Sequence, residues 1–152
     1  MKLAEALMLR ADYQRRIAQL KVRLQLNARI QDGDAAAEDP LVLLAEIEQV
    51  AVDLERMIQR INRTNSVTAL DETQSLADAL AARDLLGTRQ KIYADLAAAA
   101  AIRHDRFSRS EVRFVAAVNV GATQAQADGY ARRRRELDAR IQAANWTVDL
   151  LE

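Results

Sequence analysis

Residues 40–63 read PLVLLAEIEQVAVDLERMIQRINR and carry the clearest pattern in the chain. Apolar side chains recur there at alternating steps of three and four residues, which is the spacing of one face of an α-helix. The members of this stripe are Leu44, Ile47, Ala51, Leu54, Ile58 and Ile61. Asp39 can cap the first turn, and Pro40 suits the first helical position. The stretch therefore predicts an amphipathic helix over about residues 40–63.

The residues before this helix repeat the pattern over about 2–30, with Leu3, Ala6, Tyr13, Ile17, Leu20 and Leu24 on one face. A polar segment with Gly33 separates the two stretches. Two long helices joined by a short connection predict an antiparallel helical hairpin.

Two further helices are predicted over about 75–101 and 120–144. Ser75 begins the first with an acid three residues later, the pattern of a capping box. The second ends near Trp146, the only tryptophan, which we expect to be largely buried. The fold class is mainly α: the hairpin plus two helices, as a four-helix bundle or coiled-coil-like arrangement in a single domain over residues 1–152.

A small β insert is predicted around 111–120, where β-branched and aromatic residues alternate along EVRFVAAVNV. An isolated strand is not stable, so the segment 112–118 must pair with another. Within the chain the only β-leaning candidate is 66–70, which is short. Pairing with a neighbouring subunit would place Val112, Phe114 and Val118 at an interface.

The composition argues against several classes of protein. The 22 basic residues balance the 22 acidic ones, so no net charge favours nucleic acid or anionic lipid as a partner. There is no cysteine, and no window approaches the roughly 20 apolar residues of a membrane span. The charged N-terminal segment lacks the apolar core of a signal peptide, and we expect a cytoplasmic protein.

No catalytic arrangement is predicted. His104 is the only histidine, and no glycine-rich phosphate loop is present. We therefore expect no enzyme activity, no catalytic residue, no bound metal and no cofactor.

Three arginines, Arg10, Arg83 and Arg134, fall on otherwise apolar stripes. A buried guanidinium without a partner is costly, so three interpretations stay open. Their stems can pack while their heads reach water, or they can form ion pairs between helices or subunits. Candidate partners are Asp84, Glu111 and Asp12. In the third interpretation, Arg63, Arg83, Arg109 and Glu111 bind a small anion. The run of arginines at 132–135 points around most of a helix and is interpreted as a solvated face.

Four stretches together resemble a family of small bacterial proteins of unknown function that often bear the name septicolysin. They are MKLAEALMLRADYQRRIAQLKVRL at the start, RINRTN at 60–65, RFSRSEVRFVAAVNV at 106–120 and LDARIQAANW at 137–146. The resemblance implies a helical, oligomeric protein and no established catalytic residues. The name itself would imply a pore-forming or cytolytic activity. Asn119 stands where the family pattern suggests aspartate, which predicts a weaker helix cap.

The working hypothesis is a non-enzymatic homo-oligomer whose arginine and glutamate clusters join helices or subunits. Arg10, Arg134 and Trp146 complete the predicted interface. The alternatives are a binder of a small anion and a septicolysin-like pore former.

Overall fold

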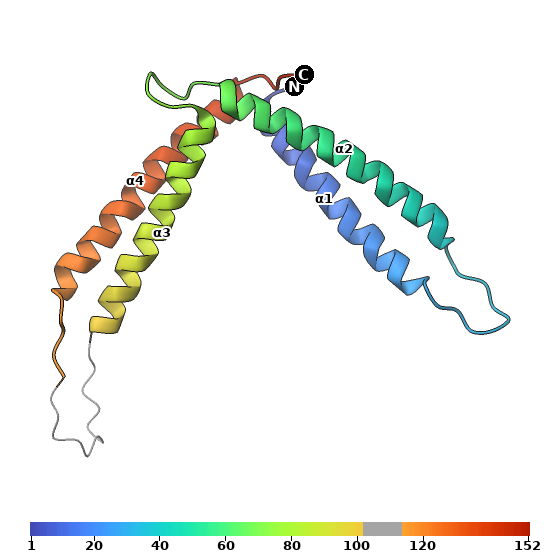
Figure 1. The fold of residues 1–152 in the computed structure, drawn as a ribbon, viewed down its shortest axis with the longest axis horizontal. Helices are drawn as coiled ribbons and strands as arrows, with labels where there is room; N and C mark the ends of the chain where they lie inside the picture. The colour runs from blue at the N-terminus through green and yellow to red at the C-terminus, as the bar shows by residue number, and fades with distance from the viewer. Residues whose placement is uncertain (102–113) are drawn as a thin grey trace, which may run out of the picture. The chain divides into compact units, whose positions relative to one another are not determined.

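The computed structural model of the protein describes residues 1–101 and 114–152. About three-quarters of these residues are helical and none belongs to a sheet (Figure 1). The helices are α1 (Leu3–Leu26), α2 (Pro40–Val67), α3 (Leu76–Ala100) and α4 (Val120–Thr147). The predicted mainly α class is confirmed.

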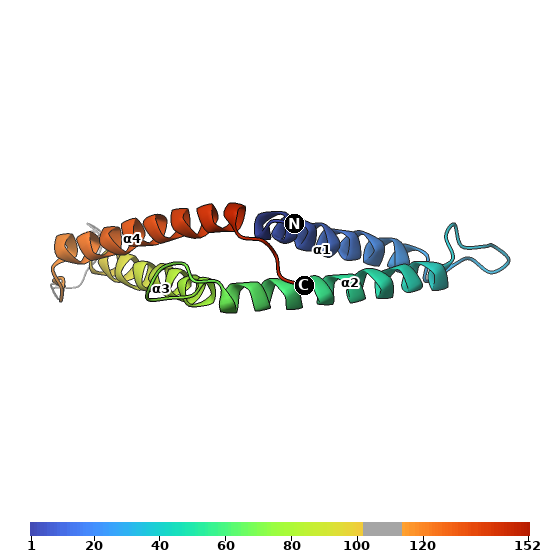
Figure 2. The ribbon, with the colours of Figure 1, turned by 90° about the horizontal axis from the view of Figure 1, so that it is seen from above.

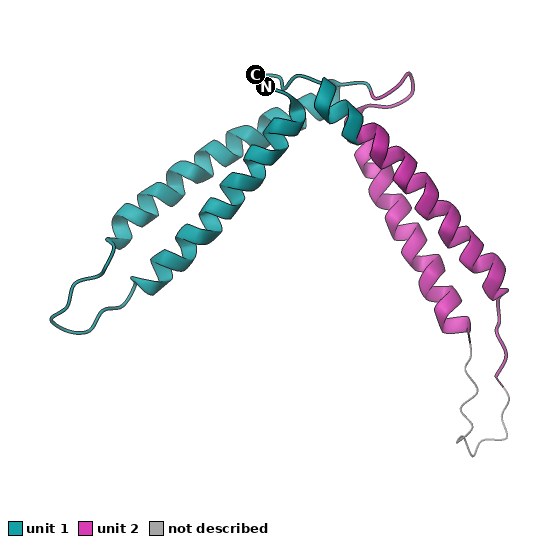
Figure 3. Cartoon of the chain, turned by 180° about the vertical axis from the view of Figure 1, so that it is seen from behind, with its two compact units in different colours: residues 1–69, 142–152 teal, residues 70–141 magenta. Residues whose placement is uncertain are grey.

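The described chain divides into two compact units (Figure 3). Unit 1 contains residues 1–69 and 142–152, and unit 2 contains residues 70–141. The helix α4 continues past residue 141, so its last turns belong to unit 1. A single domain over residues 1–152 stays a prediction, and each unit has a helix pair of its own.

In unit 1, α1 and α2 run side by side in opposite directions (Figures 1 and 2). Arg16 pairs with Glu46, while Arg23, further along α1, pairs with Glu38, which precedes α2. The residue number rises from Arg16 to Arg23 while that of the partner falls from Glu46 to Glu38, so the two helices form an antiparallel hairpin. The buried apolar side chains between these helices include Leu3, Ala6, Leu20, Leu43, Met57 and Ile61.

The C-terminal residues close one end of this hairpin. Leu3 N donates to Val148 O at 2.9 Å, and Leu150 N donates to Met1 O at 2.9 Å. Leu151 N donates to Thr64 Oγ1 at 3.0 Å, which ties the same segment to α2. Both ends of the described chain are thereby held in unit 1.

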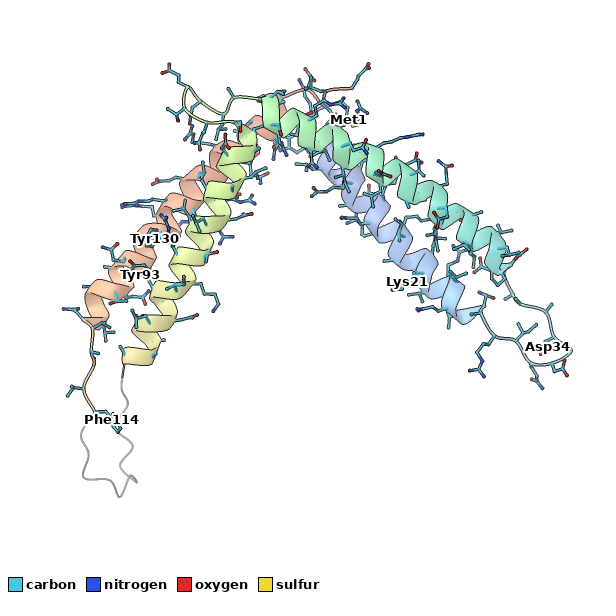
Figure 4. The ribbon with its side chains drawn as sticks, in the orientation of Figure 1. Met1, Lys21, Asp34, Tyr93, Phe114 and Tyr130 are labelled. Atoms are coloured by element: carbon cyan, nitrogen blue, oxygen red, sulfur yellow. The ribbon has the colours of Figure 1, made fainter. Side chains whose placement is uncertain are left out.

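In unit 2, α3 and α4 form a second antiparallel pair. Arg83 contacts Asp138, and Tyr93 lies against Tyr130 with ring centroids 5.3 Å apart (Figure 4). Three of the five buried apolar positions in the described part of this unit are alanines, Ala79, Ala97 and Ala127; the other two are Leu76 and Ile141. Small side chains of this kind allow two helix backbones to approach closely, so this unit encloses little apolar volume.

The predicted helix starts are confirmed by their hydrogen bonds. Leu41 N donates to Asp39 Oδ1 at 2.8 Å, and Ser75 and Asp78 form the reciprocal capping box. Asn119 Oδ1 accepts from Ala122 N at 2.8 Å. Because asparagine caps helices about as well as aspartate, the expected weakness of this cap has no counterpart in the geometry.

Helix α1 ends at Leu26, short of the predicted residue 30. The reason lies in Asn27, whose Nδ2 donates to Arg23 O at 2.9 Å and whose Oδ1 accepts from Glu38 N at 3.0 Å. These two bonds end the helix and anchor the loop. Gly33 lies beyond, in that loop, with a φ of 90°.

The predicted β insert is not seen in the described residues. Residues 114–119 form no strand, since the chain bends at Ala117 and Val118 before the Asn119 cap. In the proposed pairing segment 66–70, α2 continues to Val67, and Thr68 N still donates to Thr64 O at 3.0 Å. Continuation of the helical ladder has overridden the preference of these β-branched residues for strands. Residues 111–113 lie outside the described part of the chain.

Candidate functional site

The predicted anion site draws on residues that the structure separates. Arg63 belongs to unit 1, where its guanidinium donates to the main-chain oxygen of Glu152. Arg83 belongs to unit 2. Arg109 and Glu111, like the predicted interface residue Val112, lie outside the described residues. The four residues are therefore not shown to form a site.

Arg83 is held by two carboxylates. Its Nε and Nη2 donate to Asp84 Oδ1 at 3.0 and 2.8 Å, and its Nη1 donates to Asp138 Oδ1 at 3.2 Å. The hydrogen bonds to Asp84, and secondarily the bond to Asp138, raise the pKa of Arg83 above its ordinary value. Asp84 was one of the candidate partners, and the contact to Asp138 joins α3 to α4. Arg83 therefore serves helix pairing within unit 2.

Arg134 crosses from α4 to the one glycine of α3. A Cβ built on Gly87 would lie 3.3 Å from Arg134 Nε, so the glycine leaves space for the arginine side chain. Arg134 borders a surface groove of about 530 Å³ that is otherwise lined by α3 residues, among them Asp84, Lys91, Ile92 and Asp95. Arg134 thus lies at the edge of the outer surface of α3.

A second groove of about 600 Å³ lies between α3 and α4. It is lined by Arg83, Gln90, Ala131, Arg134, Arg135 and Asp138. Three guanidinium groups and one carboxylate give its wall a positive balance. No ion pair within residues 1–101 and 114–152 involves Arg134 or Arg135.

Arg10 lies on the buried stripe of α1 and is partly buried. Its Nε is shielded from solvent and has no hydrogen-bond partner among the described residues. The packed-stem interpretation fits this side chain, at the cost of one desolvated donor.

Trp146 contradicts the expected burial, because 59% of its surface is exposed. Ile141 and Asn145 are the buried residues on this part of α4, and Trp146 lies about 100° around the helix from Asn145. With Leu7 and Met8 of α1, among others, it lines a shallow groove of about 290 Å³ in unit 1. Phe114 is also exposed, and Val118 is half-buried.

The outer face of α3 carries a feature that the sequence analysis did not identify. Leu85, Ile92 and Leu96 are 51%, 58% and 44% exposed. Exposed small residues, Ala81, Thr88 and Ala99, continue the same line. The spacing in the sequence is again three and four, so the signal was present. It was hidden by the second stripe of α3, Leu76, Ala79, Tyr93 and Ala97, which faces α4.

Comparison with known families assigns the chain to a family whose activity is unknown. A family described as "Family of unknown function (DUF6847)" matches residues 10–150. The chain belongs to this family. No curated protein matches the chain at a significant level.

The chain is also similar to a solved structure, described as the crystal structure of a functionally unknown conserved protein from Corynebacterium diphtheriae. The two share 42% sequence identity over 99% of each chain, with a TM-score of 0.93. The findings thus support a family of unknown function. Neither description carries the septicolysin name.

Two further observations concern the described residues only. None of their helices combines the length and apolar character needed to cross a bilayer. In the same part of the chain, no three acidic or histidine side chains are grouped as a metal site would require.

Proposed function

We propose that this DUF6847 protein is a non-enzymatic protein that assembles with copies of itself. One observation carries the proposal: more large apolar side chains are exposed than buried. In the described residues, 17 large apolar side chains are exposed, whereas the buried apolar core has 13 members, five of them alanine.

The physical argument is that a helix pair encloses only a small core. Each helix of a pair covers one side of its partner, and apolar residues on the other sides stay in water unless another surface covers them. Single exposed apolar residues are common in soluble proteins, but aligned ones mark interaction surfaces. The line on α3 is aligned in this sense.

The arginines have a supporting role in this proposal. Arg16, Arg23, Arg83 and Arg140 form ion pairs that join helices or helix and loop within a unit. Arg134 lies at the edge of the exposed line and is the arginine best placed to reach a second copy. Arg134→Ala is expected to weaken assembly without changing the helical content.

Sedimentation velocity over a wide range of protein concentrations tests the proposal. The expected result is a mass above 17.0 kDa that grows with concentration toward a defined oligomer. A species of 17.0 kDa at every concentration would overturn it. Circular dichroism on the same samples checks that the helices are intact.

The groove between α3 and α4 supports a second candidate, the binding of a small multivalent anion such as phosphate. Arginine guanidinium groups suit oxyanions because their planar N–H donors match the oxygen geometry. Thermal unfolding with increasing phosphate tests it, with sodium chloride at equal ionic strength as the control. A specific rise in melting temperature that Arg135→Ala removes would support the site; equal shifts from both salts would exclude it.

Pore formation is the activity that the name septicolysin implies. No described feature or similar protein supports it. The test is whether the purified protein releases a trapped dye from liposomes. If it does, pore formation would replace self-assembly as the proposed function. We expect no release.

A further inference from the structure

We propose that the outer face of α3 is a self-pairing seam, on which a second copy of the chain packs its own α3 in the antiparallel direction. The inference rests on the proposed self-assembly and assigns it a surface. The seam is the line of exposed residues Ala81, Leu85, Thr88, Ile92, Leu96 and Ala99.

The geometry of the seam is that of a coiled-coil contact. At 100° and 1.5 Å per residue, its members fall within an arc of about 80° and extend over about 27 Å of the helix. Their steps are four, three, four, four and three residues; Ala81 to Ile92 follow the spacing of apolar heptad positions, and the second step of four before Leu96 is a stutter in that repeat. The seam lies on the side of α3 away from Tyr93 and Ala97, which face α4, so a second helix can reach it without displacing α4.

The sizes of the side chains favour an antiparallel register. If Leu85 faces Thr88 of the second copy, Ile92 faces Ala81 of that copy by the same register. The large side chains of Leu85 and Ile92 then each meet a small one, so the two helices can approach closely and fill the space between them over this part of the seam. A twofold axis relates the two copies, which makes the contact closed and self-complementary.

The charges beside the seam match the same register. Asp84 and Lys91 flank it on one side, seven residues apart. In the antiparallel pair, Asp84 of each copy lies within about 3 Å, measured along the helix axis, of Lys91 of the other. Asp84 and Lys91 are 70% and 77% exposed beside their present partners in the chain, Arg83 and Asp95, so both charged groups are also accessible to a second copy. Charge complementarity therefore selects a second copy of this chain as the occupant.

Charge reversal tests the pairing directly. Asp84→Lys places lysines opposite each other at both symmetry-related contacts between positions 84 and 91, and Lys91→Asp does the same with aspartates. Each variant alone is expected to associate several-fold more weakly than the wild type. Mixing the two variants is expected to restore association as a heterodimer, because every facing pair is then again of opposite sign. Failure of the mixture to associate better than either variant alone would overturn the register.

The absence of cysteine from the sequence allows a second test by cross-linking. Leu85→Cys protein mixed with Thr88→Cys protein is expected to form an intermolecular disulfide, since the register brings these positions within reach. Ala99→Cys is the matched control on the same seam. Its copies lie more than about 30 Å apart in the antiparallel pair and are expected not to cross-link. Efficient cross-linking through Ala99→Cys would show a parallel contact and overturn the proposal.

The apolar part of the seam is tested by Ile92→Gln. Loss of the buried side chain from both copies is expected to raise the dissociation constant at least about tenfold. Val22→Gln removes a side chain of similar exposure, 56% against 58%, from α1 in unit 1 and is expected to have no effect. Wild-type association that neither Ile92→Gln nor the charge variants alter would overturn the seam and leave self-assembly standing. A wild-type monomer at every concentration would overturn both.

Discussion

At the scale of single residues, Asp71 shows how one side chain can hold a loop to a helix. It accepts hydrogen bonds from the Thr73 hydroxyl at 2.7 Å, from Arg140 Nη2 at 2.6 Å, and from the main-chain N–H groups of Thr73 and Gln74 at 2.8 and 3.1 Å. These bonds, the Thr73 hydroxyl first, lower the pKa of Asp71 well below its ordinary value of 3.8. The loop between α2 and α3 is thereby fixed to α4.

This shift gives a stability contribution with a definite sign. Because the folded pKa is depressed, the contribution is fully present above the ordinary pKa and is lost as the pH falls below about 5 toward the folded value. Asp71→Asn is expected to lower the melting temperature at pH 7, and the difference from the wild type is expected to shrink as the pH falls toward 3. Thermal unfolding at a series of pH values measures it.

Asp32→Asn is the control for this prediction. Asp32 is exposed in the α1–α2 loop and makes no hydrogen bond among the described residues, so its replacement is expected to leave the curve unchanged. A constant difference between wild type and Asp71→Asn across the whole pH range would show that the charge of Asp71 is not what stabilises the loop.

Arg10 lowers the stability of the fold because its buried Nε has no hydrogen-bond partner among the described residues. Arg10→Met keeps an unbranched apolar stem in the α1 stripe and removes the desolvated Nε, which has no described partner. The expected gain is about 1 kcal/mol in the free energy of unfolding, measured by urea denaturation. Arg56→Met, at a side chain that is 72% exposed, is the matched control and should give no gain. A loss of stability in Arg10→Met would indicate that the guanidinium has a partner outside the described contacts.

At the scale of the helices, Gly129 weakens α4 without any visible packing reason. It lies inside the helix, and a Cβ built on it meets nothing within 4 Å. Alanine is a better helix former than glycine by about 1 kcal/mol, so Gly129→Ala is expected to raise the free energy of unfolding by about 0.5 to 1 kcal/mol. Gly33→Ala is the opposing case, because a φ of 90° is strained for alanine, and it should destabilise. Urea denaturation measures the free energy of unfolding of both variants. Equal changes in the two would contradict the claim that Gly129 weakens its helix while Gly33 is required by its backbone conformation.

The helices were largely predictable because their signals are local. The stripe of residues 40–63 and the caps at Asp39 and Ser75 each depend on residues within a few positions of one another. The β insert failed because strand preference is set by what a segment packs against, and residues 66–67 simply continue α2. The predicted burial of Trp146 was wrong for a different reason. Ile141 and Asn145 are four residues apart and share the buried face of α4, and Trp146, one residue further on, points away from that face. The prediction relied on the aromatic character of Trp146 and not on its position along the helix.

The candidate site was less predictable, since it depends on which of two stripes α3 turns toward α4. The stripe with Leu85 and Ile92 and the stripe with Leu76 and Tyr93 both have helical spacing. The contact of Tyr93 with Tyr130 shows which of the two faces α4. The sequence also placed Arg83 and Arg134 on apolar stripes and offered the adjacent Asp84 as a candidate partner, but it could not show that Asp138 pairs with Arg83 as well. That information lies in contacts between residues more than 50 positions apart.

At the scale of the whole molecule, self-assembly makes stability depend on protein concentration. An oligomer that forms only from folded chains stabilises the folded state by mass action, so the melting temperature should rise as the protein is concentrated. At a protein concentration one hundred times the dissociation constant, one binding event stabilises the folded state by up to about 2.7 kcal/mol. Calorimetry at several concentrations is expected to show this rise for the wild type and for Val22→Gln. The rise is expected to be much smaller for Ile92→Gln, whose chains are as well folded when dilute but pair poorly. A melting temperature independent of concentration in all three proteins would mean that the exposed apolar residues of α3 stay in water, and that they must then be explained by a partner other than the chain itself.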